Sequence, residues 1–295
     1  MADARTPEMQ TSQRWTVLSL LQWATEYLAA RGFDEARLHV ELLLSRVLEL
    51  PRIGLYTHFD RPLSPVELSS FKSLFRRRLG HEPLQYILGD TEFMGLTFEV
   101  NPSVLIPRPE TELLVEQALS VLRSGGPGQS VLDVGTGSGN IAVALAVMSP
   151  DSRITAMDVS ADALAVAARN ASRHAATVRF VEGDLFGSFL PGERFDLLVS
   201  NPPYVPEAEF VQLPEEIRNF EPRRATTDEG DGFRFIRRLA ESAGERLTPG
   251  GMLIMEIGYG QSEQTLAILS GAGLASVDVL PDHAHIPRVA LGRRP

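Results

Sequence analysis

Apolar residues in the first 85 positions recur every three or four residues, a spacing that is typical of amphipathic helices. The predicted buried faces lie within residues 20–28, 40–48 and 68–79. Asp34 is placed to cap the second helix, and the Ser-Pro-Val-Glu sequence at residues 64–67 is a capping box that opens the third. Gly80 stands where that helix would end. The pattern predicts a small all-helical domain.

The pattern changes after residue 86, where Leu96, Phe98 and Val100 alternate with polar residues and glycines punctuate the chain. This alternation predicts a short β-hairpin. Residues 106–112 follow with two prolines and lead into a further helix. We therefore expect a helical domain over residues 1–85, a hairpin and proline-rich connector over residues 86–110, and a second domain over residues 111–295.

Short apolar runs and amphipathic segments alternate along the second domain. Buried strands are predicted at residues 131–134, 154–157, 178–181, 197–199 and 252–257, with two more at 276–280 and 288–291. Helices are predicted at residues 140–149, 161–174, 232–247 and 261–270. This alternation predicts an α/β fold with a doubly wound sheet, whose ligands bind at the carboxyl ends of the strands.

Composition narrows the class of protein. The 295 residues exceed the usual length of one domain, and 43% hydrophobic with 22% charged residues is ordinary for a globular protein. The absence of cysteine excludes disulfides, cysteine-ligated metals and a cysteine nucleophile. We expect disorder in the first dozen residues, which are polar and lack periodicity. No secretory signal or membrane-spanning run is evident, so we expect a cytoplasmic protein with no membrane partner.

The net charge of −10 favours a protein or small-molecule substrate, because proteins that grip a nucleic-acid backbone usually carry a basic surplus. The three arginines at residues 76–78 are interpreted as a solvated helix face. His81, His283 and His285 lack the spacing of metal ligands, so no metal site is expected. The charge pattern therefore predicts no direct contact with nucleic acid.

A glycine-rich sequence directly follows the first strand of the second domain and opens a helix. It consists of Gly135, Thr136, Gly137, Ser138 and Gly139. Glycines let the backbone turn tightly and let a ligand approach where no Cβ stands in the way. A plain structural turn has a similar sequence, whereas a dinucleotide-binding loop would carry a further glycine where this chain has Asn140.

Acidic residues follow the next two strands. Asp158 stands about twenty residues after the glycines, where a carboxylate can accept hydrogen bonds from both ribose hydroxyls. Asp184 and Leu185 come at the end of the third strand and are placed to border an adenine ring. The alternative for Asp158 is an acid that merely starts a helix. Together with the glycine loop, these positions predict a nucleoside cofactor.

The most specific sequence lies at the end of the fourth strand, where Asn201, Pro202, Pro203 and Tyr204 follow one another. The two prolines remove two N–H donors and leave their carbonyls free to accept hydrogen bonds. Asn201 adds a side-chain carbonyl, and Tyr204 offers a flat aromatic face for a planar group. The alternative is a turn that ends the strand, because Asn-Pro and Pro-Pro are common turn dipeptides.

The chemistry of a planar nitrogen explains this combination. An amide nitrogen is a poor nucleophile because its lone pair is delocalised into the carbonyl. Hydrogen bonds from its N–H groups to Asn201 and to the Pro202 carbonyl would orient the nitrogen and favour the positive charge that develops on it. We therefore interpret Asn201, Pro202 and Tyr204 as residues that bind an amide or amine nitrogen and catalyse the transfer of a group to it.

These motifs resemble those of class I S-adenosylmethionine-dependent methyltransferases with an Asn-Pro-Pro-Tyr signature. The residues that carry the resemblance are 133–139, Asp158, 183–186 and 201–204. Residues 82–89 and 106–112 are similar to the connector of the release factor glutamine methyltransferases, the PrmC/HemK family. The similarity extends over nearly the whole chain and is weakest before residue 15 and within residues 207–231.

The resemblance implies a Rossmann-like, seven-stranded catalytic domain and a small helical domain for substrate recognition, joined by a β-hairpin. It implies that S-adenosyl-L-methionine is the cofactor, with its methionine end at residues 135–139, its ribose at Asp158, its adenine at Asp184 and Leu185, and Asn201 close to it. It implies that residues 201–204 receive the glutamine of the Gly-Gly-Gln (GGQ) motif of class 1 peptide chain release factors, which is methylated on N5. We expect a monomer.

Two positions depart from the family pattern. Residues 221–223 resemble the next loop of the family, but Arg-Ala-Thr-Thr at 224–227 replaces its leucine-rich continuation. Leu185 stands where a close relative often has a bulky aromatic beside the adenine. Neither departure touches the Asn-Pro-Pro-Tyr sequence.

Three other functions fit part of the sequence. A ribosomal-protein glutamine methyltransferase would have a nearly identical catalytic site. A nucleic-acid adenine N6-methyltransferase would ordinarily add a basic recognition domain, which this chain lacks. A binding module without activity would have no use for both the glycine loop and the tetrapeptide.

Overall fold

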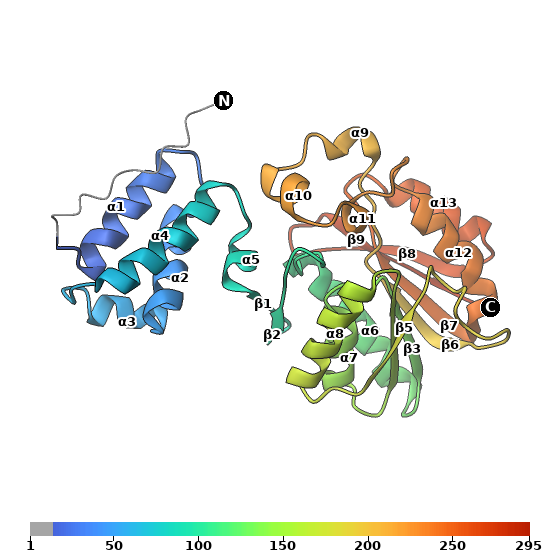
Figure 1. The fold of residues 1–295 in the computed structure, drawn as a ribbon. Helices are drawn as coiled ribbons and strands as arrows, with labels where there is room; N and C mark the ends of the chain where they lie inside the picture. The colour runs from blue at the N-terminus through green and yellow to red at the C-terminus, as the bar shows by residue number, and fades with distance from the viewer. Residues whose placement is uncertain (1–13) are drawn as a thin grey trace. The chain divides into compact units, whose positions relative to one another are not determined.

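A computed structural model describes residues 14–295, which divide between Leu88 and Gly89 into two compact units (Figure 1). The predicted disorder of the first dozen residues lies outside the described part. Residues 14–88 form the helical unit, and residues 89–295 form the sheet unit.

The helical unit is a bundle around one apolar core. Its helices are α1 (Val17–Ala29), α2 (Ala36–Leu48), α3 (Arg52–Thr57), α4 (Pro65–Leu79) and α5 (Leu84–Leu88). The apolar faces predicted from the helical spacing meet in this core, in which Leu20, Leu43 and Phe71 are almost fully buried. The three long helices follow the sequence pattern, whereas α3 and α5 are too short to show a period.

The starts of two helices show whether the caps predicted from the sequence form. Ser64 accepts a hydrogen bond from the backbone N–H of Glu67, whose side chain accepts one from the N–H of Ser64, which confirms the predicted capping box. The prediction that Asp34 caps α2 is wrong. The chain enters α2 through Glu35 in the left-handed conformation, with φ of 50°, so Asp34 lies one residue before the cap position.

The sheet unit begins with a two-stranded hairpin. Strands β1 (Asp90–Phe93) and β2 (Leu96–Glu99) pair antiparallel, and Asp90 stands opposite Glu99. Phe93 and Phe98 are buried in the main core of the sheet unit. The 3-10 helix η1 (Pro109–Thr111) and helix α6 (Glu112–Gly125) follow.

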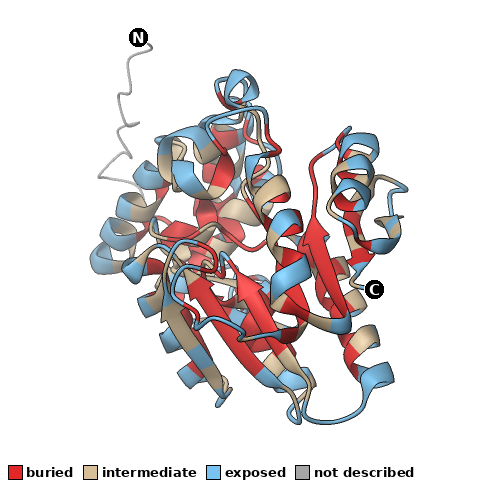
Figure 2. Cartoon of the chain, turned by 90° about the vertical axis from the view of Figure 1, so that its right-hand side faces the viewer, coloured by how far each residue is buried: buried red, intermediate tan, exposed pale blue. Residues whose placement is uncertain are grey.

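A seven-stranded sheet forms the centre of this unit. Its strands are β3 (Ser130–Val134), β4 (Arg153–Asp158), β5 (Val178–Glu182), β6 (Phe195–Ser200), β7 (Leu247–Glu256), β8 (Ala275–Pro281) and β9 (Pro287–Arg293). The spatial order is β5-β4-β3-β6-β7-β9-β8, and only the contacts of β9 with β7 and β8 are antiparallel. The central strands are among the most buried segments (Figure 2).

Helices cover both faces of the sheet, so each strand alternates its side chains between two cores. One core contains α6 and α7 (Asn140–Met148) with the hairpin, and α8 (Ala161–Arg173) packs beside α7. The other contains α12 (Arg234–Arg246) and α13 (Ser262–Gly271). Three short helices lie between β6 and α12, namely α9 (Glu207–Phe210), α10 (Glu215–Phe220) and α11 (Arg223–Thr226).

The predicted α/β fold class is confirmed. All seven predicted strands form, and the four predicted helices of the alternating region end within two residues of their predicted bounds. The prediction that residues 178–181 are buried is wrong, because β5 is an edge strand and none of its residues is fully buried. The turns α9 to α11 were not predicted, because four to six residues hold too few helical periods to be visible in the sequence.

Candidate active site

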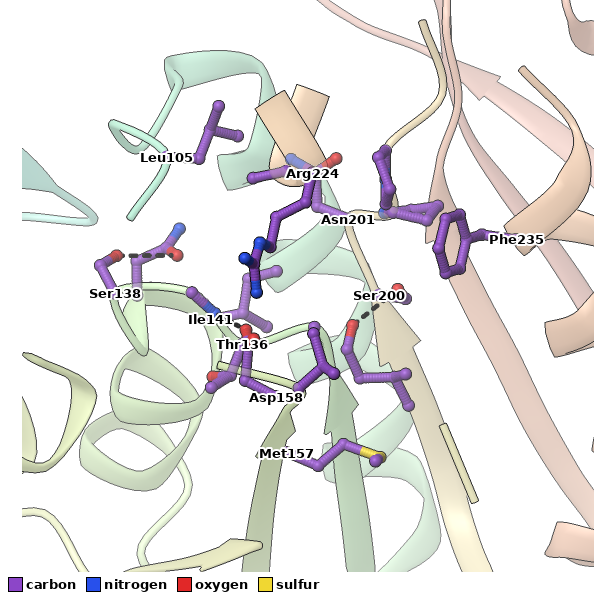
Figure 3. Close-up of a pocket in the computed structure, with 18 of the residues that line it drawn as sticks. Leu105, Thr136, Ser138, Ile141, Met157, Asp158, Ser200, Asn201, Arg224 and Phe235 are labelled. Atoms are coloured by element: carbon purple, nitrogen blue, oxygen red, sulfur yellow. Dashed lines mark hydrogen bonds between the residues drawn. The ribbon is translucent and has the colours of Figure 1, made fainter. Parts of the chain in front are cut away.

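A cavity opens at the carboxyl ends of β3, β4 and β6 in the sheet unit (Figure 3). The space it encloses, open solvent at its mouth included, is about 970 Å³. The chain order reverses between β3 and β6, which is the position where open α/β sheets bind ligands.

The glycine loop forms one wall of this cavity. Gly135 and Gly137 adopt positive φ values of 74° and 54°, a region that favours glycine, and a Cβ on either would meet no atom within 4 Å. The backbone N–H groups of Gly135 and Thr136 both donate to the Met157 carbonyl at 2.9 Å, which ties the loop to β4. The loop therefore presents open backbone to a ligand.

Gly139 serves packing instead. It is not among the residues that line the cavity, although Gly135, Thr136, Gly137 and Ser138 are. A Cβ at Gly139, which has φ of 80°, would stand 2.9 Å from the Cβ of Ala167 on α8. The third glycine thus allows the start of α7 to approach α8.

Asp158 ends β4 and lines the cavity beside the loop. Its two oxygens accept hydrogen bonds from the backbone N–H groups of Gly137 and Ser160, each at 2.9 Å. Burial raises the pKa of this carboxyl, and these hydrogen bonds and the charge of Arg224 lower it. Each carboxylate oxygen keeps a lone pair for a ligand hydroxyl.

A second carboxylate, Asp133, supports the loop without lining the cavity. Its Oδ2 accepts from the hydroxyl of Thr136 at 2.6 Å, while its fully buried Oδ1 has no hydrogen-bond partner in the described chain. Burial raises the pKa of Asp133 to about 7. Its contact with Thr136 fixes the loop from the side of β3.

Another part of the wall is apolar. Leu185, Phe235 and Leu239 line it, together with Met157 and Val159. Asp184 also lines the cavity, but its carboxylate pairs with Arg238 at 3.0 Å. Asp184 and Leu185, the predicted neighbours of an adenine, thus line the same cavity as the aromatic ring of Phe235.

Asn201 and both prolines of the tetrapeptide line the side of the cavity next to the glycine loop. The hydroxyl of Ser200, the last residue of β6, donates to the Val134 carbonyl at 2.7 Å and links the two strand ends. The Nδ2 of Asn201 donates to the Thr111 hydroxyl at 3.0 Å. Within residues 14–295, neither Asn201 Oδ1 nor the Pro202 carbonyl accepts a hydrogen bond.

Tyr204 lies apart from these acceptors. It is not among the lining residues, and its hydroxyl donates to Oε1 of Glu256 at 3.0 Å. Its own carbonyl accepts from the Gln261 side chain at 2.9 Å. Burial, with the nearby charge of Glu256, raises the pKa of Tyr204. The structure thus joins Tyr204 to a buried carboxylate, and its flat face for a substrate stays a prediction.

The remaining wall joins segments that are distant in sequence. The carboxylate of Glu221, just before α11, pairs with Arg108 and accepts from the N–H of Ile106 at 3.2 Å. Arg108 and Arg224 both line the cavity, and the Arg224 side chain turns into it from α11 (Figure 3). The Arg224 side chain makes no hydrogen bond or ion pair with the described residues.

Several lining residues were not predicted from the sequence. Thr111 lies within residues 106–112, which resemble the family connector, and Arg224 lies within residues 224–227, which differ from the family pattern. Neither residue was assigned to the site from the sequence, although both line the cavity. Leu105 and Phe235 carry no local signal, because an apolar residue in a loop or helix is more often part of a core.

The most similar relatives compared share their name and almost their full length with this chain. The release factor glutamine methyltransferase of Geobacter sulfurreducens is 48% identical over 279 residues, which cover 95% of this chain and 97% of the relative. The protein of the same name from Chlorobaculum tepidum is 45% identical over 289 residues, which cover 95% and 98%. The chain belongs to the release factor glutamine methyltransferases. The resemblance inferred from the motifs is therefore confirmed, and the protein is a methyltransferase.

Two domain families match this chain, the PrmC N-terminal domain over residues 19–89 and the methyltransferase small domain over residues 109–217. Among solved structures, a 16S rRNA N2 methyltransferase from T. thermophilus, solved with AdoMet and guanosine, has a TM-score of 0.53 at 19% identity. The likeness covers 70% of this chain and 50% of that one, and it supports the fold alone. None of the described helices is both long and apolar enough to cross a membrane.

Proposed function

We propose that this protein transfers a methyl group from S-adenosyl-L-methionine to the side-chain nitrogen, N5, of the glutamine in the GGQ motif of class 1 peptide chain release factors. The observation that carries the proposal is the pair of unpartnered acceptors, Asn201 Oδ1 and the Pro202 carbonyl, on residues that line one cavity with Asp158 and the glycine loop. The shared name of the relatives supplies the substrate class.

The residues of the cavity fit the proposed cofactor. Gly135 and Gly137 leave a cradle that a Cβ would fill, and it suits the methionine end. Asp158 presents a carboxylate to ribose hydroxyls, and Leu185 with Phe235 gives apolar surface for an adenine. When bound, S-adenosyl-L-methionine supplies a methyl group that its sulfonium centre has already activated. No metal or covalent nucleophile is needed for the transfer.

Asn201 and Pro202 then act on the glutamine. The two N–H groups of its amide donate to Asn201 Oδ1 and to the Pro202 carbonyl, which holds the nitrogen in one orientation. Both acceptors also stabilise the positive charge that grows on this nitrogen as it gains the methyl group, and the nitrogen then releases one of its N–H protons to water. Because the methyl group is already activated, orientation supplies much of the rate. Pro203 keeps the backbone stiff between Pro202 and Tyr204.

We also propose a cellular compartment, an oligomeric state and the partners of the protein. A translation factor as substrate places the reaction in the cytoplasm. We propose a monomer in which the helical unit recognises the release factor, without direct contact to nucleic acid or membrane.

The test is transfer of labelled methyl from S-adenosyl-L-methionine to an unmodified class 1 release factor. A release factor whose GGQ glutamine is changed to alanine is the control. We expect label on the parent factor and none on the control. Label on neither, with label on a ribosomal protein or on DNA instead, would keep the methyltransferase and overturn the substrate.

A further inference from the structure

A buried carboxylate stands behind the tetrapeptide. Glu256 is the last residue of β7, its side chain is almost fully buried, and it forms no ion pair within the described chain. Its Oε2 accepts from the Thr111 hydroxyl at 2.5 Å, and its Oε1 accepts from the Tyr204 hydroxyl at 3.0 Å. Taking a carboxylate out of water is unfavourable unless hydrogen bonds replace its hydration. One of these bonds comes from Tyr204 of the tetrapeptide, and the other comes from Thr111, which itself contacts Asn201.

The Thr111 hydroxyl connects this carboxylate to Asn201. A hydroxyl has one proton to donate, and Thr111 donates it to Glu256. Its oxygen is therefore an acceptor toward Asn201, and it receives Nδ2 of Asn201 at 3.0 Å. An asparagine amide carries its N–H groups on one side and its oxygen on the other, so this bond turns Oδ1 away from Thr111.

We propose that Glu256 and Thr111 are positioning residues that set the orientation of the Asn201 amide, so that Asn201 presents an acceptor to the substrate. The chain of bonds runs in one direction, from Asn201 Nδ2 to Thr111 and from Thr111 to Glu256. If Thr111 donated to Asn201 Oδ1 instead, Asn201 would turn its N–H groups toward an amide nitrogen that also carries N–H groups. The same carboxylate holds Tyr204, so both ends of the tetrapeptide depend on it. The kinetic consequence rests on the proposed function.

The surroundings of Glu256 act on the pKa of its carboxyl in opposite directions. Burial raises the pKa of its carboxyl, and the hydrogen bonds from Thr111 and Tyr204 lower it. The charge of Arg288 also lowers this pKa, while that of Glu110 raises it. The net effect is a raised pKa, because burial outweighs the two hydroxyl donors and the nearby cation.

The kinetic test is a double-mutant cycle between Thr111→Val and Asn201→Ala. Valine keeps the shape of threonine and removes its hydroxyl. We expect Thr111→Val to lower kcat about tenfold or more with the affinity for S-adenosyl-L-methionine unchanged within about threefold, because one positioning bond is lost. Thr111→Ser should recover most of kcat. In the Asn201→Ala background, Thr111→Val should lower kcat less than about twofold.

Thr248→Val is the matched control. The Thr248 hydroxyl also donates to a carboxylate, that of Asp196 at 2.9 Å, near the amino end of β6 and away from the cavity. This variant should keep the parent kcat. Losses from Thr111→Val and Asn201→Ala that multiply independently, or no recovery with Thr111→Ser, would overturn the proposal. If Glu256→Gln also folds, it should show the same dependence on Asn201.

A second measurement needs no substrate. The side-chain N–H resonances of Asn201 in the ¹⁵N-labelled full chain are assigned by their loss in Asn201→Ala. We expect their exchange with water to rise about tenfold in Thr111→Val and to stay unchanged in Thr248→Val. Unchanged exchange in Thr111→Val would overturn the positioning role even if the release factor is methylated. Faster exchange without release factor methylation would overturn the proposed function and leave the positioning role intact.

Discussion

The two sides of the cavity are built by different means. On the side of β3 and β4, the glycine loop is held by hydrogen bonds between residues close in sequence, such as Thr136 with Asp133, and by the neighbouring strand end at Asp158. On the side of β6, Asn201 is held by Thr111, which is 90 positions away, and through it by Glu256. The first side is a local motif, while the second depends on the assembled fold.

Because the two sides are built differently, we expect the loop side to bind the ligand and the Asn201 side to orient the substrate. Positive φ values and open space at Gly135 and Gly137 give the loop a surface for binding. The Asn201 side has unpartnered acceptors, whose value depends on their direction. We therefore expect changes on the loop side to affect affinity or stability, and changes on the Asn201 side to affect the rate of transfer.

The largest effect is expected for Asn201→Ala. Methyl transfer should fall about a hundredfold or more, because an acceptor for the reacting amide is lost, while cofactor affinity stays within a few-fold. Single-turnover transfer to the release factor and calorimetric titration with the cofactor measure the two quantities. Equal activity in variant and parent would remove Asn201 from the mechanism.

The two sides of the cavity also differ in how far the sequence predicts them. The glycine loop, Asp158 and the tetrapeptide each carry their signal within a few residues, and the structure brings all three to one edge of the sheet. Gly139 and Tyr204 belong to the same motifs, yet one packs against Ala167 and the other binds Glu256. Motifs identify residues that matter without saying which of them face the ligand.

Long-range partners had no signal in the sequence. Apolar runs predicted all seven strands of the sheet, and the reason is clearest for the central parallel strands β3 and β6, which are buried on both faces. Nothing in the vicinity of Thr111 indicates that it meets Asn201, and Glu256 has the appearance of an acid at a strand end. Pairs of this kind form only when η1, β6 and β7 are packed together, so they follow from the tertiary fold.

Asp133, the buried carboxylate on the loop side, should make the free energy of unfolding depend on pH. Burial raises the pKa of Asp133 to about 7, against about 3.9 for an exposed aspartate. Between these values the folded protein holds a proton that the unfolded chain has released, so stability falls as pH rises. From pH 5.0 to 6.5, this group should remove about 2 kcal/mol from the free energy of unfolding.

Asp133→Asn isolates that contribution, because asparagine does not titrate and its oxygen can still accept from Thr136. Denaturant unfolding of parent and variant at both pH values gives the difference in slope. Parallel pH dependence of the two proteins would show that Asp133 ionises in the folded state as it does in the unfolded chain.

Asp158→Ala should act on binding before it acts on rate. Loss of a carboxylate that accepts ribose hydroxyls should weaken cofactor affinity about tenfold, with transfer at saturating cofactor changed only a few-fold. This result would be the opposite of that for Asn201→Ala and would sharpen the division between the two sides. Unchanged cofactor affinity in equilibrium titration would overturn the ribose assignment.

The smallest expected effect is a difference in stability between alanine substitutions at two glycines of the loop. Gly137→Ala and Gly139→Ala both place a side chain at positive φ, which disfavours alanine by about 1–2 kcal/mol. The methyl group at Gly139 also meets Ala167 at 2.9 Å, whereas at Gly137 it meets open space. Gly139→Ala should therefore be less stable than Gly137→Ala by about 1 kcal/mol, because overpacking adds to the backbone strain.

Cofactor affinity should rank the same pair in the reverse order. Gly137 lines the cavity and Gly139 does not, so the added methyl group obstructs the ligand only at Gly137. Thermal unfolding and cofactor titration of both variants therefore give two opposite orders. If Gly139→Ala lost affinity as strongly as Gly137→Ala at equal stability, the loop would act as a single unit. The separation of binding from packing along these five residues would then be wrong.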